Sequence, residues 1–353
     1  MSDAHLPGVS RRSFLKYVAA GGAALGLATI GPGVLTACGS SEPAATDSWK
    51  LQVNWTPDVT WAGSFLAAED GIYQQQGFSN GLDIMYGGPN VAVEPVIESG
   101  KATMGVCSTE TFAAAVAAGA DLVALGAFMQ RNPYCIASLP ENPILKPEDM
   151  VGKRIGIQAL NDPIYEALLA VNGLTADQVT KVVVQNDPTP LVNGEVDGFL
   201  SFVGNQPIAL ELAGHPTELL MLADAGIPLF QELYVVTRDK LANDRDVITA
   251  GLTAEIIGKQ LVARDPERAA ELTVTKYAKD QNIQLEMAQK QLQRNTQLWD
   301  TDTSRTRGLM YMTDADIQAN LQTLGLLGFD GVTADNYSTE ILDDIYSGGI
   351  DLL

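Results

Sequence analysis

The sequence contains little histidine, little cysteine and few positive charges. Its 353 residues include two histidines and three cysteines, and 22 Lys and Arg stand against 43 Asp and Glu, for a net charge of -21. So few cysteines exclude a disulfide framework, although one bridge between Cys107 and Cys135 stays open. The negative charge repels nucleic acid and anionic headgroups, so we expect the protein to bind neither. No His, Cys or acidic pattern marks a metal site or a nucleophile, and we expect no cofactor and no catalytic residue.

The N-terminus carries an export signal. Residues 10–16 read Ser-Arg-Arg-Ser-Phe-Leu-Lys, the twin-arginine pattern, and an apolar run over residues 17–34 follows them. Glycines and a proline interrupt this run, which is therefore too weak for a membrane-spanning helix and typical of a removable signal. The Leu-Thr-Ala-Cys that follows resembles a bacterial lipobox, with Cys38 as the lipidated residue; a core helix with an ordinary buried cysteine is the alternative.

Cleavage before Cys38 would remove residues 1–37 and leave 316 of the 353 residues. It would take away three cations and one anion and so change the net charge from -21 to -23. Residues 38–48 are rich in Gly, Ser and Pro and indicate a flexible tether, so a lipid anchor alone would hold the protein at the outer face of the cytoplasmic membrane. The remaining length and the 46% hydrophobic content suit two domains.

The body of the chain alternates short strands and helices. This alternation predicts an α/β fold with short parallel strands in two series, the second beginning after residues 131–133. Beyond Leu241 the pattern becomes almost wholly helical. The predicted strands are 50–54, 82–86, 104–107, 122–130, 135–139, 154–158, 181–185 and 219–222. The predicted helices are 62–76, 93–99, 109–118, 163–171, 247–264, 267–280, 285–295 and 314–324.

One unit occurs in both series. Gly100 precedes a strand, a helix that ends at Gly119 and a further strand, and Gly194 and Gly214 mark the same succession later in the chain. The paired glycines are separated by 19 and 20 residues. This similarity predicts one supersecondary unit in each of two lobes, and a coincidence between two common helix-strand units is the alternative.

Several short segments carry a resemblance to a known family. They are residues 54–58, 62–63, 69–73, 77, 87–90, 99–102, 147–156 and 193–197. With them the chain resembles the solute-binding proteins of ABC importers, in particular those for thiamine pyrimidine precursors, taurine and other sulfonates, nitrate and riboflavin. The resemblance covers about residues 51–234. It implies a two-lobed periplasmic-binding-protein-like fold of type II, with a ligand cleft between the lobes and a helical C-terminal segment.

The resemblance also implies how such a protein works. Two lobes close on a small solute, and a permease of the inner membrane recognises the closed form, with no catalytic group required. Pro133 and Pro228 mark irregular backbone, and we place the crossings between the lobes there. The first lobe then spans residues 49–131 and 232–353, and the second lobe residues 132–231. We expect a monomer.

Candidate ligand contacts in the first lobe follow predicted strands, where α/β folds open their crevice. Trp55 and Trp61 would stack on a flat ring, or they pack in the core. Ser108, Thr109 and Glu110 would contact the solute, cap the following helix, or do both. Gly87, Gly88 and Asn90 would let backbone approach a ligand, or they form a turn. Asp58, Glu110 and Glu232 would accept hydrogen bonds from an amino group or pair with a cationic ring, or they are solvated surface carboxylates.

The second lobe supplies polar and aromatic candidates at equivalent strand ends. They are Gln158, Asn161, Ser201, Phe202 and Asn205. Uncharged groups of this kind suit a neutral heteroaromatic solute, such as an aminomethylpyrimidine precursor of thiamine, better than an anion. Riboflavin, a sulfonate such as taurine, and nitrate remain alternatives, with Arg131 as the one obvious residue for an anion.

An enzyme is the rival from another class. The chain also resembles the fungal thiamine pyrimidine synthase, which works with an active-site histidine, a lysine-bound pyridoxal phosphate and a cysteine-rich iron motif. In this sequence His5 lies in the signal, His215 follows the helix-ending Gly214, and the cysteine cluster is missing. We therefore expect a binding protein and not an enzyme.

Overall fold

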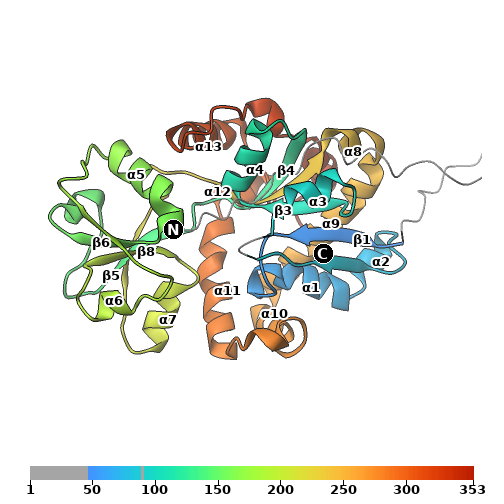
Figure 1. Ribbon diagram of the computed structural model, residues 1–353. Helices are drawn as coiled ribbons and strands as arrows, with labels where there is room; N and C mark the ends of the chain where they lie inside the picture. Colours follow the sequence, from blue (N-terminus) through green and yellow to red (C-terminus); the bar gives the residue numbers. More distant parts are fainter. Residues whose placement is uncertain (1–46, 89–90) are drawn as a thin grey trace, which may run out of the picture. The chain divides into compact units, whose positions relative to one another are not determined.

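The computed structural model describes residues 47–88 and 91–353, which form two five-stranded sheets with helices on both faces of each (Figure 1). The signal segment, Cys38 and Asn90 lie outside the described residues. The first sheet has the order β2-β1-β3-β10-β4 and the second the order β7-β6-β8-β5-β9. The strands of the first sheet are β1 (Trp49–Val53), β2 (Leu82–Met85), β3 (Met104–Cys107), β4 (Leu122–Met129) and β10 (Gln231–Thr237). Those of the second are β5 (Tyr134–Ser138), β6 (Arg154–Ile157), β7 (Thr180–Val183), β8 (Gly198–Phe202) and β9 (Glu218–Met221).

The expectation of parallel strands is wrong in part, because both sheets are mixed. β1 pairs with β2 and β3 in parallel, but β10 lies antiparallel to both β3 and β4. In the second sheet β5 likewise lies antiparallel to β8 and β9. The strands that break the parallel pattern are the two that follow a crossing of the chain between the sheets. A strand that enters a sheet from the other sheet arrives at its carboxyl edge, and it must therefore run back against its neighbours.

Two of the helices that the sequence predicts are broken in the structure. The predicted helix 62–76 is two helices, α1 (Ala62–Glu69) and α2 (Ile72–Gln75), because Gly71 between them has a φ of 70°. The predicted helix 267–280 becomes α10 (Pro266–Leu272) followed by a π-helical turn at Thr273–Tyr277. The other helices are α3 (Glu94–Glu98), α4 (Thr109–Ala117), α5 (Asp162–Val171), α6 (Thr189–Val192), α7 (Gln206–Leu212), α8 (Arg238–Asn243), α9 (Arg245–Arg264), α11 (Leu285–Trp299), α12 (Asp302–Arg307), α13 (Asp314–Leu326) and α14 (Glu340–Ile345). Short 3-10 turns are η1 (Val59–Trp61), η2 (Pro147–Met150), η3 (Ala159–Asn161), η5 (Lys279–Gln281), η6 (Ala334–Asn336) and η7 (Tyr346–Gly348).

The repeated unit occupies equivalent places in the two sheets. Gly100, Gly119, Gly194 and Gly214 all have φ between 70° and 99°, the left-handed conformation of a residue that ends a helix. The strands after Gly100 and Gly194 are β3 and β8, each the middle strand of its sheet, and those after Gly119 and Gly214 are the edge strands β4 and β9. The two sheets are therefore built to one plan.

Helix α9 packs closely on α1 against one face of the first sheet. Gly63 of α1 and Gly258 of α9 face each other, and a Cβ on Gly258 would lie 2.1 Å from the carbonyl oxygen of Gly63. This approach brings Glu255 and Lys259 of α9 under the sheet, where both are buried. Trp49, Tyr73 and Tyr234 pack around them in the core of this lobe.

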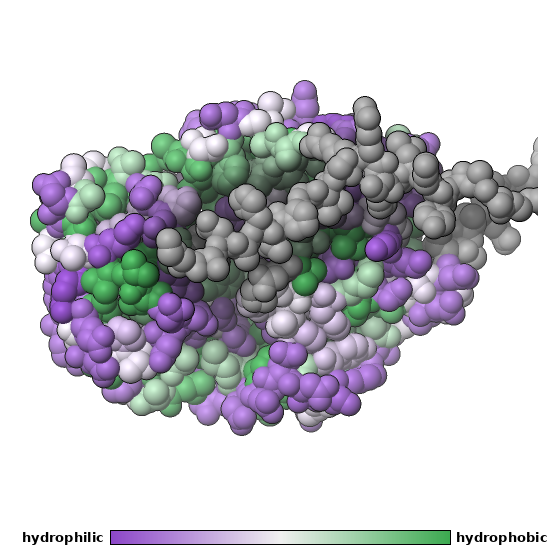
Figure 2. Space-filling view, in the orientation of Figure 1, coloured by the Kyte–Doolittle hydropathy of each residue, from purple (hydrophilic) through white to green (hydrophobic). Residues whose placement is uncertain are grey.

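Exposed apolar residues are scattered. On the face drawn in Figure 2, hydrophilic residues alternate with small hydrophobic groups. Trp55 and Val183 are among the large apolar side chains that are exposed. Cys107 and Cys135 are both free and buried, so the described residues contain no bridge between them. Within the described ranges, no helix is both long enough and apolar enough to span a membrane.

Candidate functional site

Three carboxyl groups gather where strands of the first sheet end. Asp58 follows β1, Glu110 begins α4 after β3, and Glu232 is the second residue of β10. Gln231, the neighbour of Glu232, donates a hydrogen bond to Glu110, and β1, β3 and β10 are adjacent in the sheet, so the three residues lie at the same edge. None of the three forms an ion pair within the described part of the chain. We call Asp58, Glu110 and Glu232 the carboxyl cluster.

Glu232 is the most constrained member of the carboxyl cluster. Its φ of 56° lies in the left-handed region, which is unfavourable for a residue with a Cβ. Its atom Oε2 is enclosed and finds no hydrogen-bond donor among the described residues. Burial, and then repulsion by Asp58, raise the pKa of Glu232 to about 8, against a smaller opposing effect of Lys259 and the Asn54 amide. This carboxyl group therefore stays largely protonated at neutral pH.

The other two carboxyl groups have one hydrogen-bonding partner each. Oδ1 of Asp58 accepts a hydrogen bond of 2.8 Å from the backbone N–H of Thr60 and caps η1. Oε2 of Glu110 accepts one of 2.8 Å from the side-chain amide of Gln231. Burial raises the pKa of both groups, and these hydrogen bonds only partly offset it. A ligand with N–H donors would satisfy the acceptor atoms that stay free.

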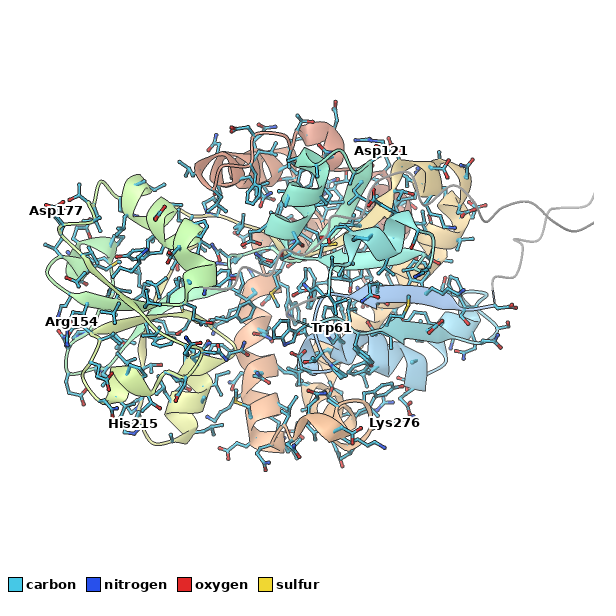
Figure 3. The ribbon with its side chains drawn as sticks, in the orientation of Figure 1. Trp61, Asp121, Arg154, Asp177, His215 and Lys276 are labelled. Carbon is cyan, nitrogen blue, oxygen red and sulfur yellow. The ribbon has the colours of Figure 1, made fainter. Side chains whose placement is uncertain are left out.

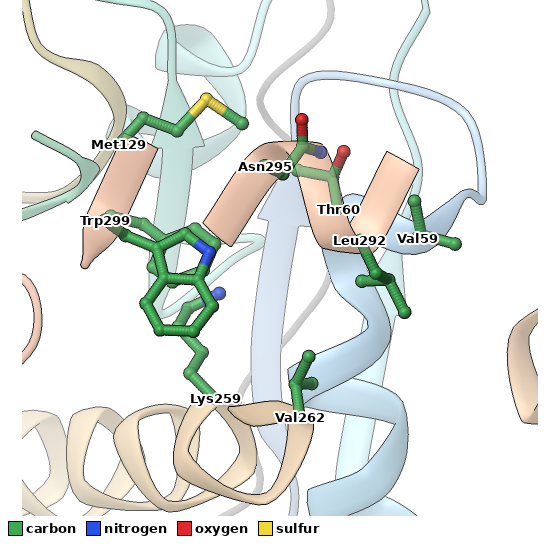
Figure 4. A pocket seen from close by; sticks show the side chains of 10 residues that line it. Val59, Thr60, Met129, Lys259, Val262, Leu292, Asn295 and Trp299 are labelled. Atoms are coloured by element: carbon green, nitrogen blue, oxygen red, sulfur yellow. The ribbon is translucent and has the colours of Figure 1, made fainter. Parts of the chain in front are cut away.

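A buried lysine lies behind the carboxyl cluster. Lys259 is 2% exposed, and its Nζ lies 3.6 Å from the ring centroid of Phe128. Burial lowers its pKa to about 8, although attraction by Glu255 and Glu232 opposes the shift. Figure 4 shows its amino group and the indole of Trp299 at the same small cavity, which measures about 20 Å³ and holds about one water molecule. Thr60 lines this cavity too.

Glu255 neutralises this lysine and is itself fully satisfied. Its two carboxylate oxygens accept hydrogen bonds from Ser64 at 2.7 Å, Tyr73 at 2.6 Å, Tyr234 at 3.2 Å and the indole of Trp49 at 3.3 Å. Four donors compensate this carboxyl group for its burial. Glu255 is therefore part of the scaffold, whereas Glu232, which lacks such donors, is available to a ligand.

The two tryptophans that were predicted to stack on a ligand ring differ in their exposure to solvent. Trp61 is 1% exposed, and its Nε1 donates a hydrogen bond of 3.2 Å to the carbonyl of Thr56, so it packs in the core (Figure 3). This is the packing alternative, and the ring has almost no surface left for a ligand. Trp55 is 46% exposed and stays a candidate.

The glycines and the helix-capping residues have local roles. A Cβ on Gly87 would lie 2.5 Å from the carbonyl of Asn54, and the backbone N–H groups of Gly87 and Gly88 donate to the carbonyls of Trp55 and Asn54. Gly87 thus permits an approach between two segments of the chain itself. Ser108 caps α4 by accepting a hydrogen bond of 3.1 Å from the N–H of Thr111.

Thr109 links α4 to the segment that returns from the second sheet. It is fully buried, and its hydroxyl donates to the carbonyl of Phe230. Thr109 is therefore a structural residue, and Glu110 is the residue of this motif whose side chain joins the carboxyl cluster.

The candidates of the second lobe are only partly available. Ser201 is buried, and its hydroxyl donates to the carbonyl of Phe199 in its own strand. Asn205 accepts a hydrogen bond of 3.1 Å from Gln291 of α11. Gln158 and Asn161 are half-buried at either end of the segment before α5, and Phe202 is half-buried at the end of β8. Phe202, Gln158 and Asn161 stay the candidates of this lobe.

Arg131 does not offer a free positive charge for an anion. Its guanidinium lies 2.6 Å from the carboxylate of Asp224, so it joins the two crossing segments. His215, the residue on which the enzyme alternative depends, lies near the outer end of the second sheet, far from Trp61 in Figure 3. In the described residues no group of three or more His, Cys, Asp or Glu side chains is arranged to hold a metal ion.

Sequence reasoning missed Asn54, Glu94 and Lys259. Oδ1 of Asn54 and Oε1 of Glu94 are enclosed without a hydrogen-bond partner, and Glu94 is 5% exposed. Asn54 directly follows β1, and the expectation that ligand contacts follow the ends of strands, which gave Asp58, could have found it. Lys259 could not have been found from the sequence. Glu255 and Lys259 are four residues apart in a long helix, and this spacing usually indicates an exposed ion pair.

Comparison with known proteins identifies the fold. The model of the family described as NMT1/THI5 like matches residues 58–269. The periplasmic aliphatic sulphonate binding protein SsuA from Escherichia coli is similar with a TM-score of 0.61 at 15% identity, over 80% of this chain and 87% of that one. The periplasmic nitrate-binding protein NrtA from Synechocystis PCC 6803 gives 0.56 at 13% identity, over 86% and 89%. A ligand binding component of an ABC-type import system from Staphylococcus aureus gives 0.57 at 10% identity, over 84% and 99%.

These similarities confirm the two-lobed periplasmic-binding-protein fold inferred from the sequence. At such identities they establish the fold alone. No curated protein sequence matches the chain.

Proposed function

The chain belongs to the NMT1/THI5-like family, and from this premise we propose that it is the solute-binding component of an ABC import system. In this function the two lobes close on a small solute, and a permease of the inner membrane takes up the closed form. The names of the similar structures, which are binding proteins and a component of an ABC-type import system, support this proposal. Twin-arginine export and a lipid anchor at Cys38 complete it, and would place the protein at the outer face of the cytoplasmic membrane.

We infer that the solute is a small heteroaromatic compound with amino groups, such as an aminomethylpyrimidine precursor of thiamine. The carboxyl cluster carries this inference. Asp58, Glu110 and Glu232 offer hydrogen-bond acceptors at a site where Glu232 still lacks a donor. Amino groups or a protonated ring nitrogen would supply donors and positive charge at this point.

The same cluster disfavours an anion. A sulfonate or nitrate at this place would meet three carboxyl groups, and Arg131 is already paired with Asp224. Lys259 is buried in the core, and the nearby carboxyl group of Glu255 offsets part of its positive charge. The anions named for the similar structures therefore do not carry over to this chain, even though the fold does.

A thermal-shift screen of the purified body, residues 39–353, tests this function. An aminomethylpyrimidine, riboflavin, taurine and nitrate form the panel. A ligand present at a hundred times its dissociation constant stabilises by about 2.7 kcal/mol, which raises the Tm by a few degrees in a protein of this size. We expect the aminomethylpyrimidine to raise the Tm and the two anions to leave it unchanged.

Two variants make the screen specific for the carboxyl cluster. Glu232→Gln replaces one carboxyl oxygen by an NH2 donor and abolishes the negative charge, so it should lose the Tm shift, whereas Asp177→Asn changes an exposed carboxylate of the second lobe and should keep it. A Tm shift with taurine or nitrate that Glu232→Gln leaves unchanged or increases would show that the solute is an anion.

A further inference from the structure

The small cavity at Lys259 lies at the same edge of the first sheet as the carboxyl cluster. Thr60 lines this cavity, and the backbone N–H of Thr60 donates the hydrogen bond of 2.8 Å to Asp58 that caps η1. Met129 also lines it, and Met129 pairs across β4 and β10 with Gln231, whose amide donates to Glu110. Two separate links therefore place the cavity next to the carboxyl cluster.

One side of the cavity carries nitrogen atoms that only donate hydrogen bonds. Figure 4 shows the amino group of Lys259 and the indole nitrogen of Trp299 on this side, and both side chains are buried. Nζ of Lys259 lies over the ring of Phe128, and this ring stacks on Trp299 with centroids 5.7 Å apart. A ring face attracts the charge but leaves the N–H donors without an oxygen acceptor. Within residues 47–88 and 91–353, neither nitrogen atom forms a hydrogen bond to an oxygen atom.

The other side of the cavity carries an acceptor without a donor. In Figure 4 the amide of Asn295 lies there with the hydroxyl of Thr60. Asn295 is 8% exposed, and its Oδ1 is enclosed and finds no donor among the described residues. A buried acceptor of this kind is unfavourable unless another molecule supplies a donor.

The size and the polar atoms of the cavity together select a hydroxyl group. The cavity measures about 20 Å³, so it holds one atom of the size of a water oxygen. A hydroxyl oxygen accepts two hydrogen bonds and its hydrogen donates one, which matches donors on one side and an acceptor on the other. An ammonium group cannot accept from Lys259, and a carbonyl oxygen cannot donate to Asn295.

We propose that this cavity is a hydroxyl-binding subsite of the solute site, where Lys259 and Trp299 donate to a hydroxyl oxygen of the solute and Asn295 accepts its hydrogen. A water molecule has the same hydrogen-bonding chemistry and would occupy the cavity before the solute binds. The solute then carries amino groups where the carboxyl cluster holds it and a hydroxyl group on another substituent. The proposal rests on the proposed function, because it needs a small solute at this edge of the sheet.

Two compounds without amino groups test the subsite independently of the carboxyl cluster. They are benzyl alcohol and toluene, which differ by one hydroxyl group. Nitrogen NMR of the indole groups in the folded body follows Trp299 directly, and the variant Trp299→Phe assigns its signal. We expect benzyl alcohol to move the Trp299 signal and toluene to leave it in place. The indole of Trp49 is the internal control, because it already donates to Glu255 and should not respond to either compound.

Calorimetry with a second pair of compounds measures the contribution of the hydroxyl group to affinity. An aminopyrimidine with a hydroxymethyl substituent should bind the wild type about 10-fold more tightly than the same compound with a methyl substituent. Trp299→Phe removes one donor and keeps an aromatic ring against Phe128, and Asn295→Leu removes the acceptor and keeps the size of the side chain. Either variant should reduce the 10-fold difference, whereas a purely structural role would weaken the binding of both compounds by the same factor. Trp49→Phe removes a buried indole donor outside the cavity and should retain the difference.

The outcomes separate the subsite from the proposed function. Equal affinity of the wild type for the two aminopyrimidines would show that the cavity holds only a resident water, and would overturn the subsite. A Trp299 signal that neither hydroxyl compound moves would overturn it as well. A signal moved by benzyl alcohol, with no binding of any aminopyrimidine, would support the subsite and contradict the proposed solute.

Discussion

Replacement of Glu232 by Gln should stabilise the ligand-free protein and remove part of its pH dependence. The carboxyl oxygen Oε2 of Glu232 is enclosed without a donor, and the backbone at this residue has a φ of 56°. Both features are unfavourable in the absence of a ligand. Gln has the same shape, carries no charge and brings its own donor to the carboxyl cluster.

The magnitude follows from the pKa of Glu232, which is raised from its usual value of 4.5 to about 8. A raised folded-state pKa means that the contribution of this group to stability is complete below pH 4.5 and is lost as the pH rises to 8. At pH 7 the loss corresponds to about 3 kcal/mol. Part of this gain is lost in the variant, because the Gln amide buries an NH2 group that needs acceptors of its own. We expect Glu232→Gln to be more stable by about 2 kcal/mol at pH 7 and nearly equal to the wild type at pH 4.5.

Urea unfolding of the body at pH 4.5, 6, 7 and 8 measures this difference. The comparison ends at pH 8 because the pKa of Lys259 is lowered to about 8, so above this pH the folded protein also loses the charge of Lys259. A second comparison separates strain from charge: Glu232→Gly should be more stable than Glu232→Ala by about 1 kcal/mol, since only Gly adopts this φ without strain. Equal free energies of unfolding for the wild type and Glu232→Gln at every pH would show that the carboxyl group is hydrated, and would refute the reasoning.

Three further predictions concern other residues. Trp61→Ala should lower the free energy of unfolding by about 3–5 kcal/mol because the ring is buried. Trp55→Ala should leave the free energy of unfolding unchanged and weaken ligand binding by roughly 1–3 kcal/mol. Urea unfolding and calorimetry measure the two effects, and the reverse pattern would contradict the assignment. Glu255→Gln should destabilise by about 3–5 kcal/mol because it disrupts the buried hydrogen bonds from Ser64, Tyr73, Tyr234 and Trp49, and an unchanged Tm would argue against that role. Cys38→Ala should move the protein from the membrane fraction to the soluble fraction, and a variant that still pellets with membranes would contradict the lipobox.

The positions of most strands were predictable because apolar runs and helix-ending glycines bound them, but β8 and β10 are absent from the predicted strands. Met104–Cys107 was predicted with its observed limits, and the glycine spacing predicted that β3 and β8 are equivalent. The direction of β5 and β10 was not predictable, since strand direction depends on which sheet a strand enters after a crossing. No residue pattern within either strand encodes that choice.

The candidate site was predictable in its carboxyl groups and less so in its aromatic rings. Asp58 and Glu110 were found because strand ends in α/β folds meet at one edge, whereas no strand was predicted at Glu232. Trp61 and Trp55 are alike in sequence terms, and only the turn η1, which rotates one ring into the core, distinguishes them.

The carboxyl cluster also indicates why a shared fold is compatible with different solutes. In the absence of ligand the cluster is under strain, with one carboxyl group protonated and one residue held at an unfavourable φ. A solute with amino groups would relieve this by giving donors to Glu232 and letting it ionise, so binding should release a proton and strengthen as the pH rises from 6 to 8. An anion would do the opposite, because it adds negative charge to a site whose nearest cation, Lys259, is already balanced by Glu255. Proton release measured by calorimetry in two buffers of different ionisation enthalpy separates these cases, and proton uptake on binding would exclude the cationic solute.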